Sequence, residues 1–84
     1  MASREEVYGS LKEVLVERLK VEPDSVKEDA NLFEDLGLDS IDLMTVVMAV
    51  EEKFGIEVSD EELENVTTLG EATELLSEKV AANA

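Results

Sequence analysis

A helix-start pattern occurs three times in this sequence and limits the folds open to it. A serine or threonine stands three residues before a glutamate in the pairs Ser3 and Glu6, Ser59 and Glu62, and Thr68 and Glu71. In such a capping box the hydroxyl accepts the backbone N–H of the glutamate, whose carboxylate accepts the N–H of the capping residue. No segment shows the apolar alternation of a β-strand. The sequence therefore predicts an all-α fold.

Apolar residues at one-face helical spacing follow these starts and predict three main helices. We expect one short helix of one or two turns over 60–65 and the main helices over 3–20, 39–54 and 69–80. Gly55 supplies a stop for the second helix, because glycine readily adopts the left-handed backbone that ends many helices. The tail at 81–84 is expected to fray, as chain ends do unless they are tied down.

A long loop is expected between the first two helices. Pro23 disfavours helical backbone at Glu22, and residues 21–39 show no sustained period. Apolar residues would hold this loop against the body: Val26, Leu32, Phe33, Leu36 and Leu38. The chain is thus predicted to be a single domain, residues 1–84, built as a small bundle of three main helices plus one short helix.

Composition restricts the chemistry open to the chain. Aromatic residues make up 4%, so the core must be aliphatic, and the sequence has no Cys and no His. These absences remove thiolate nucleophiles, imidazole bases and most zinc sites, so we identify no catalytic residue and no resident metal site. An enzyme with Ser40 as nucleophile would lack a base, and no EF-hand loop is present for a calcium buffer.

The net charge is −15 and is unevenly distributed. Residues 1–27 carry five bases and six acids, whereas residues 28–84 carry two bases and sixteen acids. Such a surface repels nucleic acid and anionic membrane, and it favours proteins with basic patches as partners. No apolar run approaches the roughly 20 residues that span a bilayer, and the N-terminus lacks the features of a signal peptide. We therefore expect a cytoplasmic protein that does not insert into membranes.

Ser40 stands at the first turn of the second predicted helix, directly after the loop and between the carboxylates of Asp39 and Asp42. It is either only a favourable helix-start residue or, if Asp39 is the N-cap, a hydroxyl free to be modified. A helix N-terminus stabilises an attached phosphate. Asp39 is then a candidate ligand for a divalent cation used by a phosphoryl-transfer enzyme acting on Ser40.

The second predicted helix is apolar on two sides. One stripe consists of Leu43, Val46, Val47, Val50 and Phe54, and a second, offset stripe consists of Ile41, Met44 and Met48. A helix of this kind either sits deep in a core or presents one stripe to a partner. Methionine suits contacts with several partners because its side chain is flexible.

The run Glu34-Asp35-Leu36-Gly37-Leu38-Asp39-Ser40-Ile41 places an acidic Leu-Gly segment before an Asp-Ser-Ile triplet at the start of the second predicted helix. This run resembles the hallmark of the acyl carrier protein family, an Asp-Ser-Leu triplet that opens the second helix after an acidic Leu-Gly segment. Residues 47–54, 60–62 and 66–68 are also similar, so the resemblance covers nearly the whole length.

The resemblance implies that Ser40 carries a 4′-phosphopantetheine arm. A holo-synthase, or phosphopantetheinyl transferase, would add the arm from coenzyme A, and its terminal thiol would hold acyl groups as thioesters. The protein would then be a non-catalytic, monomeric shuttle. It would serve acyltransferases, ketosynthases and other enzymes of fatty acid biosynthesis.

Further residue assignments follow for the carrier. Asp39 would take part in recognition by the holo-synthase. A partner-binding face on the second helix would combine acids and apolar residues, namely Ile41, Asp42, Met44, Met48, Glu51 and Glu52. This face would dock weakly on basic patches, as a shuttle requires. The interior would open to shelter the acyl chain, lined by Leu43, Val46, Val47, Leu63, Leu69, Ala72 and Leu76.

Two alternatives stay open. The family's commonest housekeeping members have Thr-Val-Glu-Leu where this chain has Leu43-Met44-Thr45-Val46, which makes a specialised carrier for a polyketide or an unusual lipid the first alternative. The second is a protein of another class, a non-carrier acidic helical interaction module. In that module Ser40 would do no more than start a helix.

Overall fold

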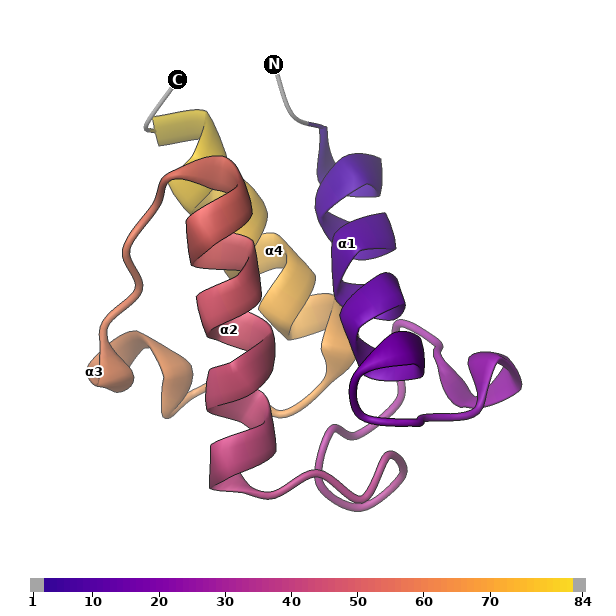
Figure 1. Ribbon diagram of the computed structural model, residues 1–84. Helices are drawn as coiled ribbons and strands as arrows, with labels where there is room; N and C mark the ends of the chain where they lie inside the picture. The colour runs from indigo at the N-terminus through magenta and orange to yellow at the C-terminus, as the bar shows by residue number, and fades with distance from the viewer. Residues whose placement is uncertain (1–2, 83–84) are drawn as a thin grey trace.

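The computed structural model describes residues 3–82, and this part of the chain is helical (Figure 1). Its elements, in order, are α1 (Arg4–Glu17), the 3₁₀ helix η1 (Pro23–Ser25), α2 (Ser40–Phe54), α3 (Asp60–Leu63) and α4 (Leu69–Ala82). The described residues form no strand beyond an isolated antiparallel bridge between Asn31 and Thr68. The predicted all-α fold, with three main helices, one short helix and a long first connection, is confirmed.

The helices differ from the predicted ones in four places, the first of which is that α3 ends at Leu63 rather than near Asn65. α1 ends at Glu17 rather than near Lys20, because Lys20 takes left-handed backbone (φ 60°) and the N–H of Val21 turns back to the carbonyl of Leu15 at 2.9 Å. The loop expected to lack regular structure contains η1, which Pro23 opens. α4 continues through Ala82, so 81–82 are helical, and residues 83–84 lie outside the described part.

The predicted helix starts are in place. At α3 the box closes in both directions: the Ser59 hydroxyl accepts the N–H of Glu62 at 3.2 Å, and the Glu62 carboxylate accepts the N–H of Ser59 at 3.1 Å. Thr68 and Glu71 close the same box before α4. Because the Glu71 carboxylate accepts the N–H groups of Thr68 and Thr67, the pKa of Glu71 lies below its ordinary value. At α1 the Ser3 hydroxyl accepts the N–H of Glu6 at 3.2 Å.

The core is aliphatic, as the composition predicts. α1 packs against both α2 and α4, and its Val7, Leu11 and Leu15 are almost fully buried. Val46, Val47 and Val50 of α2, with Leu69, Ala72, Leu76 and Val80 of α4, complete the centre. This packing holds three helices of 14 or 15 residues around one interior. The short α3 lies beside α2 (Figure 1), and its Leu63 packs against the core.

The long first connection is fixed by backbone hydrogen bonds to the start of α4. The N–H groups of Leu69 and Gly70 donate to the carbonyls of Ala30 and Glu28 at 3.0 and 2.8 Å, so the loop satisfies two amides that a helix start leaves without intrahelical partners. Arg4 adds ion pairs from α1 to Glu28 and to Glu74 of α4. The loop is therefore a packed part of the bundle.

Four of the five apolar residues expected to hold this loop do so. Val26, Leu32 and Leu38 are buried and Leu36 packs on the core. Phe33 does not, since it is 40% exposed. The Asn31 side chain accepts the N–H groups of Phe33 and Glu34, each at 2.9 Å, and this tight turn leaves the phenyl ring at the surface.

Gly70 is a position where the fold has no room for a side chain. A Cβ there would lie 2.9 Å from the backbone carbonyl oxygen of Glu28, whereas a Cβ at Gly9 in α1 would meet nothing within 4 Å. Gly70→Ala should lower the free energy of unfolding by about 1–2 kcal/mol, because the loop must shift. Gly9→Ala should raise it by roughly 0.5–1 kcal/mol through lower chain entropy in the unfolded state.

Urea unfolding followed by far-UV circular dichroism measures both changes. The same Gly-to-Ala change is thus expected to lower the free energy of unfolding at position 70 and to raise it at position 9. Equal effects at the two glycines would contradict the close approach of the loop to α4.

Candidate functional site

Ser40 opens α2 and is exposed. Asp39 provides the N-cap, as predicted: its Oδ1 accepts the N–H of Asp42 at 2.8 Å, and Oδ2 of Asp42 accepts the N–H of Asp39 at 3.3 Å. At the other end, Gly55 (φ 67°) stops α2. Since the two aspartates satisfy the cap between them, the Ser40 hydroxyl makes no hydrogen bond within residues 3–82.

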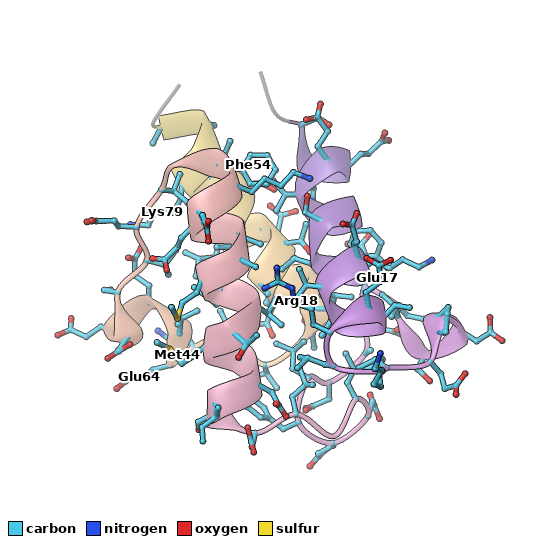
Figure 2. The ribbon with its side chains drawn as sticks, in the orientation of Figure 1. Glu17, Arg18, Met44, Phe54, Glu64 and Lys79 are labelled. Atoms are coloured by element: carbon cyan, nitrogen blue, oxygen red, sulfur yellow. The ribbon has the colours of Figure 1, made fainter. Side chains whose placement is uncertain are left out.

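An open groove begins at Ser40 and runs between α2, α3 and the two connections that flank them. It has a volume of about 330 Å³ and is lined by Phe33, Ser40, Leu43, Met44, Asp60, Leu63, Glu64, Val66 and Thr67. Met44 of α2 and Glu64, which follows α3, both line the groove, and Figure 2 shows them on the same side of the molecule. The groove thus offers apolar side chains next to an exposed hydroxyl.

A second, closed cavity lies between the helices. Its volume is only about 10 Å³, around the limit for holding one water molecule. Its lining includes all seven residues that the sequence assigned to the interior: Leu43, Val46, Val47, Leu63, Leu69, Ala72 and Leu76. The prediction omitted five further lining residues, Leu11, Leu15, Leu32, Leu38 and Leu75. The first two are on the apolar stripe of α1, which signals them, whereas Leu32 and Leu38 come from the loop, where no period marks the buried side.

Two leucines separate the groove from the interior. Leu43 of α2 and Leu63 of α3 line both cavities. Leu43 is buried and Leu63 is half-buried. A small displacement of this wall would therefore join the groove beside Ser40 to the interior.

The second stripe of α2 points outward. Ile41, Met44 and Met48 are 76%, 42% and 59% exposed, and with Phe33 they are the large exposed apolar side chains of the described chain. The first stripe is buried or half-buried against the core. The two-stripe pattern thus separates inside from outside as the sequence indicates, and Phe33 adds an exposed apolar residue that the pattern did not assign to the site.

The four acids assigned to this helix differ in their surroundings. Asp39 and Asp42 form the reciprocal cap. Glu51 is half-buried, and its Oε2 accepts the N–H of Val58 at 2.8 Å. Glu52 is exposed and makes no hydrogen bond within the described chain. Among residues 3–82 no group of three or more Asp, Glu, His or Cys side chains is placed to hold a metal ion.

Comparison with known proteins defines the class of this domain. Residues 9–76 match the family model described as a phosphopantetheine attachment site. The acyl carrier protein of Sulfurovum sp. is 49% identical over 70 residues, which cover 83% of this chain and 93% of that protein. The acyl carrier protein of Thermotoga maritima is 41% identical over 80 residues, covering 95% and 99%.

Solved structures agree with the sequence comparisons. The crystal structure of the Thermotoga maritima acyl carrier protein superposes with a TM-score of 0.83 at 25% identity, covering 96% of this chain and 94% of that chain. The acyl carrier protein of Enterococcus faecalis superposes with a TM-score of 0.76 at 33% identity, covering 93% and 99%. The chain belongs to the acyl carrier protein family.

Membership in this family gives the general function. The protein is a non-catalytic carrier with 4′-phosphopantetheine as its prosthetic group. It interacts with the transferase that adds this group and with enzymes of fatty acid synthesis. None of the helices in the described part of the chain is long and apolar enough to cross a bilayer.

Proposed function

We propose that the Ser40 hydroxyl is the attachment point of the 4′-phosphopantetheine group. The observation that carries this proposal is the free hydroxyl at a helix start. At the other serine helix starts, Ser3 and Ser59, the hydroxyl is used in the cap, and the Ser10 hydroxyl accepts a hydrogen bond from Lys53. At Ser40 the cap is formed by Asp39, so the serine oxygen is left for chemistry.

The surroundings of Ser40 suit a phosphodiester. The first amides of a helix and its dipole stabilise a phosphate without a basic side chain. Oδ1 of Asp39 is bound to the N–H of Asp42, and the second oxygen of this exposed carboxylate is available to the transferase and its divalent cation. The bound group supplies a thiol for thioester chemistry that the chain itself, without Cys, cannot provide.

Ser25 provides a matched control for Ser40. It is also exposed, it ends η1, and it makes no side-chain hydrogen bond within the described chain. Ser40→Ala should abolish the mass gain of the phosphopantetheine group after co-expression with a phosphopantetheinyl transferase, while Ser25→Ala should keep it. Mass spectrometry of the intact protein reads the result, and a modified Ser40→Ala protein would refute the assignment.

We propose that seven interior side chains shelter the acyl chain, namely those of Leu43, Val46, Val47, Leu63, Leu69, Ala72 and Leu76. All seven side chains border the same closed cavity, and Leu43 and Leu63 connect it to the groove beside Ser40. The cavity of about 10 Å³ cannot hold a chain as it stands, so the helices must move apart on loading. The purely aliphatic lining supports this proposal, because no aromatic packing has to be broken for the helices to part.

Loading is expected to shift the methyl resonances of the sheltering residues. With a long acyl chain on the prosthetic group, Val46, Val47 and Leu76 should show clear chemical-shift changes relative to the protein with a free thiol. Val16 of α1, which is half-buried but does not border the cavity, serves as the reference. Unchanged shifts at all of the interior methyl groups would place the chain outside the bundle.

Docking is proposed to use the exposed face of α2. Ile41, Met44 and Met48 supply apolar contacts and Asp42, Glu51 and Glu52 supply negative charge, to which the net charge of −15 adds a long-range attraction for basic enzymes. Holo-synthase, acyltransferases and ketosynthases are the proposed partners. We also infer that residues 1–84 work as one monomeric carrier domain in the cytoplasm, which the absence of Cys supports.

Charge reversal tests the docking face. Glu52→Lys should slow modification of Ser40 by roughly tenfold at low ionic strength and by much less at high salt, because screening removes the attraction. Glu22→Lys makes the same charge change in the first connection and should leave the rate near that of the parent protein. Initial rates at two salt concentrations give the answer, and equal slowing by the two variants would remove the specific role of this face.

One residue supports a second candidate function beside the fatty-acid carrier, namely a specialised carrier for a polyketide or an unusual lipid. Thr45 stands where the housekeeping members place a Glu, and its hydroxyl donates to the Ile41 carbonyl at 3.1 Å, so this position offers no charge to a partner. The thioester species on the Ser40 peptide, isolated from cells and identified by mass spectrometry, would decide between a fatty-acid and a specialised cargo.

A further inference from the structure

α3 forms the thinnest part of the wall around the interior. It has four residues, Asp60–Leu63, and none of them is fully buried. Leu63 is its only apolar residue, and this side chain borders both the closed cavity and the groove beside Ser40. Since α3 itself contributes one apolar side chain, polar contacts add to the hold that Val58 and Val66, packed on the core on either side of it, have on its position.

Glu62 makes the main polar contact between α3 and the rest of the bundle. Its Oε2 lies 2.7 Å from Nζ of Lys79 in the last turn of α4, while its Oε1 accepts the N–H and the hydroxyl of Ser59. The two side chains of the pair are only 31% and 33% exposed, so the pair is partly shielded from water. The hydrogen bonds from Lys79 and Ser59 lower the pKa of Glu62. One carboxylate thus joins the start of α3 to α4.

A second contact fixes the connection that leads into α3. Glu51, near the end of α2, accepts the N–H of Val58, the residue just before the Ser59 cap. Lys79 borders the same surface hollow as residues 55–57 of this connection, and Figure 2 shows its side chain on that side of the molecule. Two contacts therefore hold α3: Glu51 binds the backbone just before its N-cap, and Lys79 binds Glu62 within it.

Lys79 also offsets a local excess of negative charge. The segment around α3 carries Asp60, Glu61, Glu62 and Glu64, and it faces an acidic α2. Lys53, the other base after Lys27, donates to Ser10 of α1 and is not part of this region. Without Lys79, repulsion between these carboxylates would favour movement of α3 away from the bundle.

We propose that Lys79 is a positioning residue that sets how readily α3 moves away, and so how easily the interior admits an acyl chain. Opening removes Leu63 from the wall and breaks the Glu62–Lys79 pair. This inference rests on the proposed sheltering of the acyl chain in the interior. It adds a residue of α4, 39 positions from Ser40 in the sequence, that controls access to that interior.

Amide hydrogen exchange on the full chain with unmodified Ser40 tests whether the Glu62–Lys79 pair holds α3 in place, without any acyl chain present. Lys79→Met keeps the length of the side chain and removes its charge. It should speed exchange of the amides of Val58, Leu63 and Glu64 by about twofold to fivefold, the range for loss of one partly shielded ion pair. Lys79→Arg should restore slow exchange. The control Lys12→Met makes the same charge change on exposed α1 and should leave these rates unchanged.

The amides of Leu11 and Leu15 in α1 serve as the internal reference for global stability. Faster exchange confined to the α3 region supports the positioning role of Lys79. Unchanged exchange in Lys79→Met, or an equal increase in α1, overturns it. The methyl-shift experiment on the acylated protein reports separately on the sheltering residues. Faster local exchange together with unchanged methyl shifts would mean that Lys79 does restrain α3 but that the acyl chain does not enter the interior.

Discussion

The hydrogen bonds exchanged between Asp39 and Asp42 determine what the rest of the site can be. An N-cap satisfies an amide that the helix itself leaves unpaired, and serine is a common residue for this task. Ser3 and Ser59 perform it in this protein, and their hydroxyls are consequently bound. With an aspartate as cap one residue earlier, the helix start is equally stable while Ser40 keeps a free oxygen at the positive end of the helix dipole.

α2 connects the Ser40 oxygen to the interior and to the exposed docking face, because its two apolar stripes face different ways. At 3.6 residues per turn, Leu43 and Val47 point into the bundle while Met44 and Met48, one position later, remain on the surface. A cargo attached at the helix start therefore has an apolar interior on one side and an apolar outer face on the other. Leu43 belongs to the boundary, since it borders the groove and the interior at once.

Local features of the fold were predictable from the sequence, and long-range ones were not. Asp39, Gly55 and the stripes of α2 depend on residues within about four positions, so spacing alone reveals them. The exposure of Phe33 depends on a turn made by Asn31, and the pairing of Glu62 with Lys79 joins residues 17 positions apart. Periodicity carries no information on such contacts, because they follow from how the elements pack.

The few basic side chains are placed so that the bundle stays folded while its surface remains strongly negative. After residue 27 the chain has two bases, and both bind within the fold, Lys53 to Ser10 and Lys79 to Glu62. Arg4 likewise pairs with Glu28 and Glu74. Because these cations sit between elements, they offset repulsion where helices must meet. The remaining carboxylates stay uncompensated, and their combined field attracts basic partners at a distance.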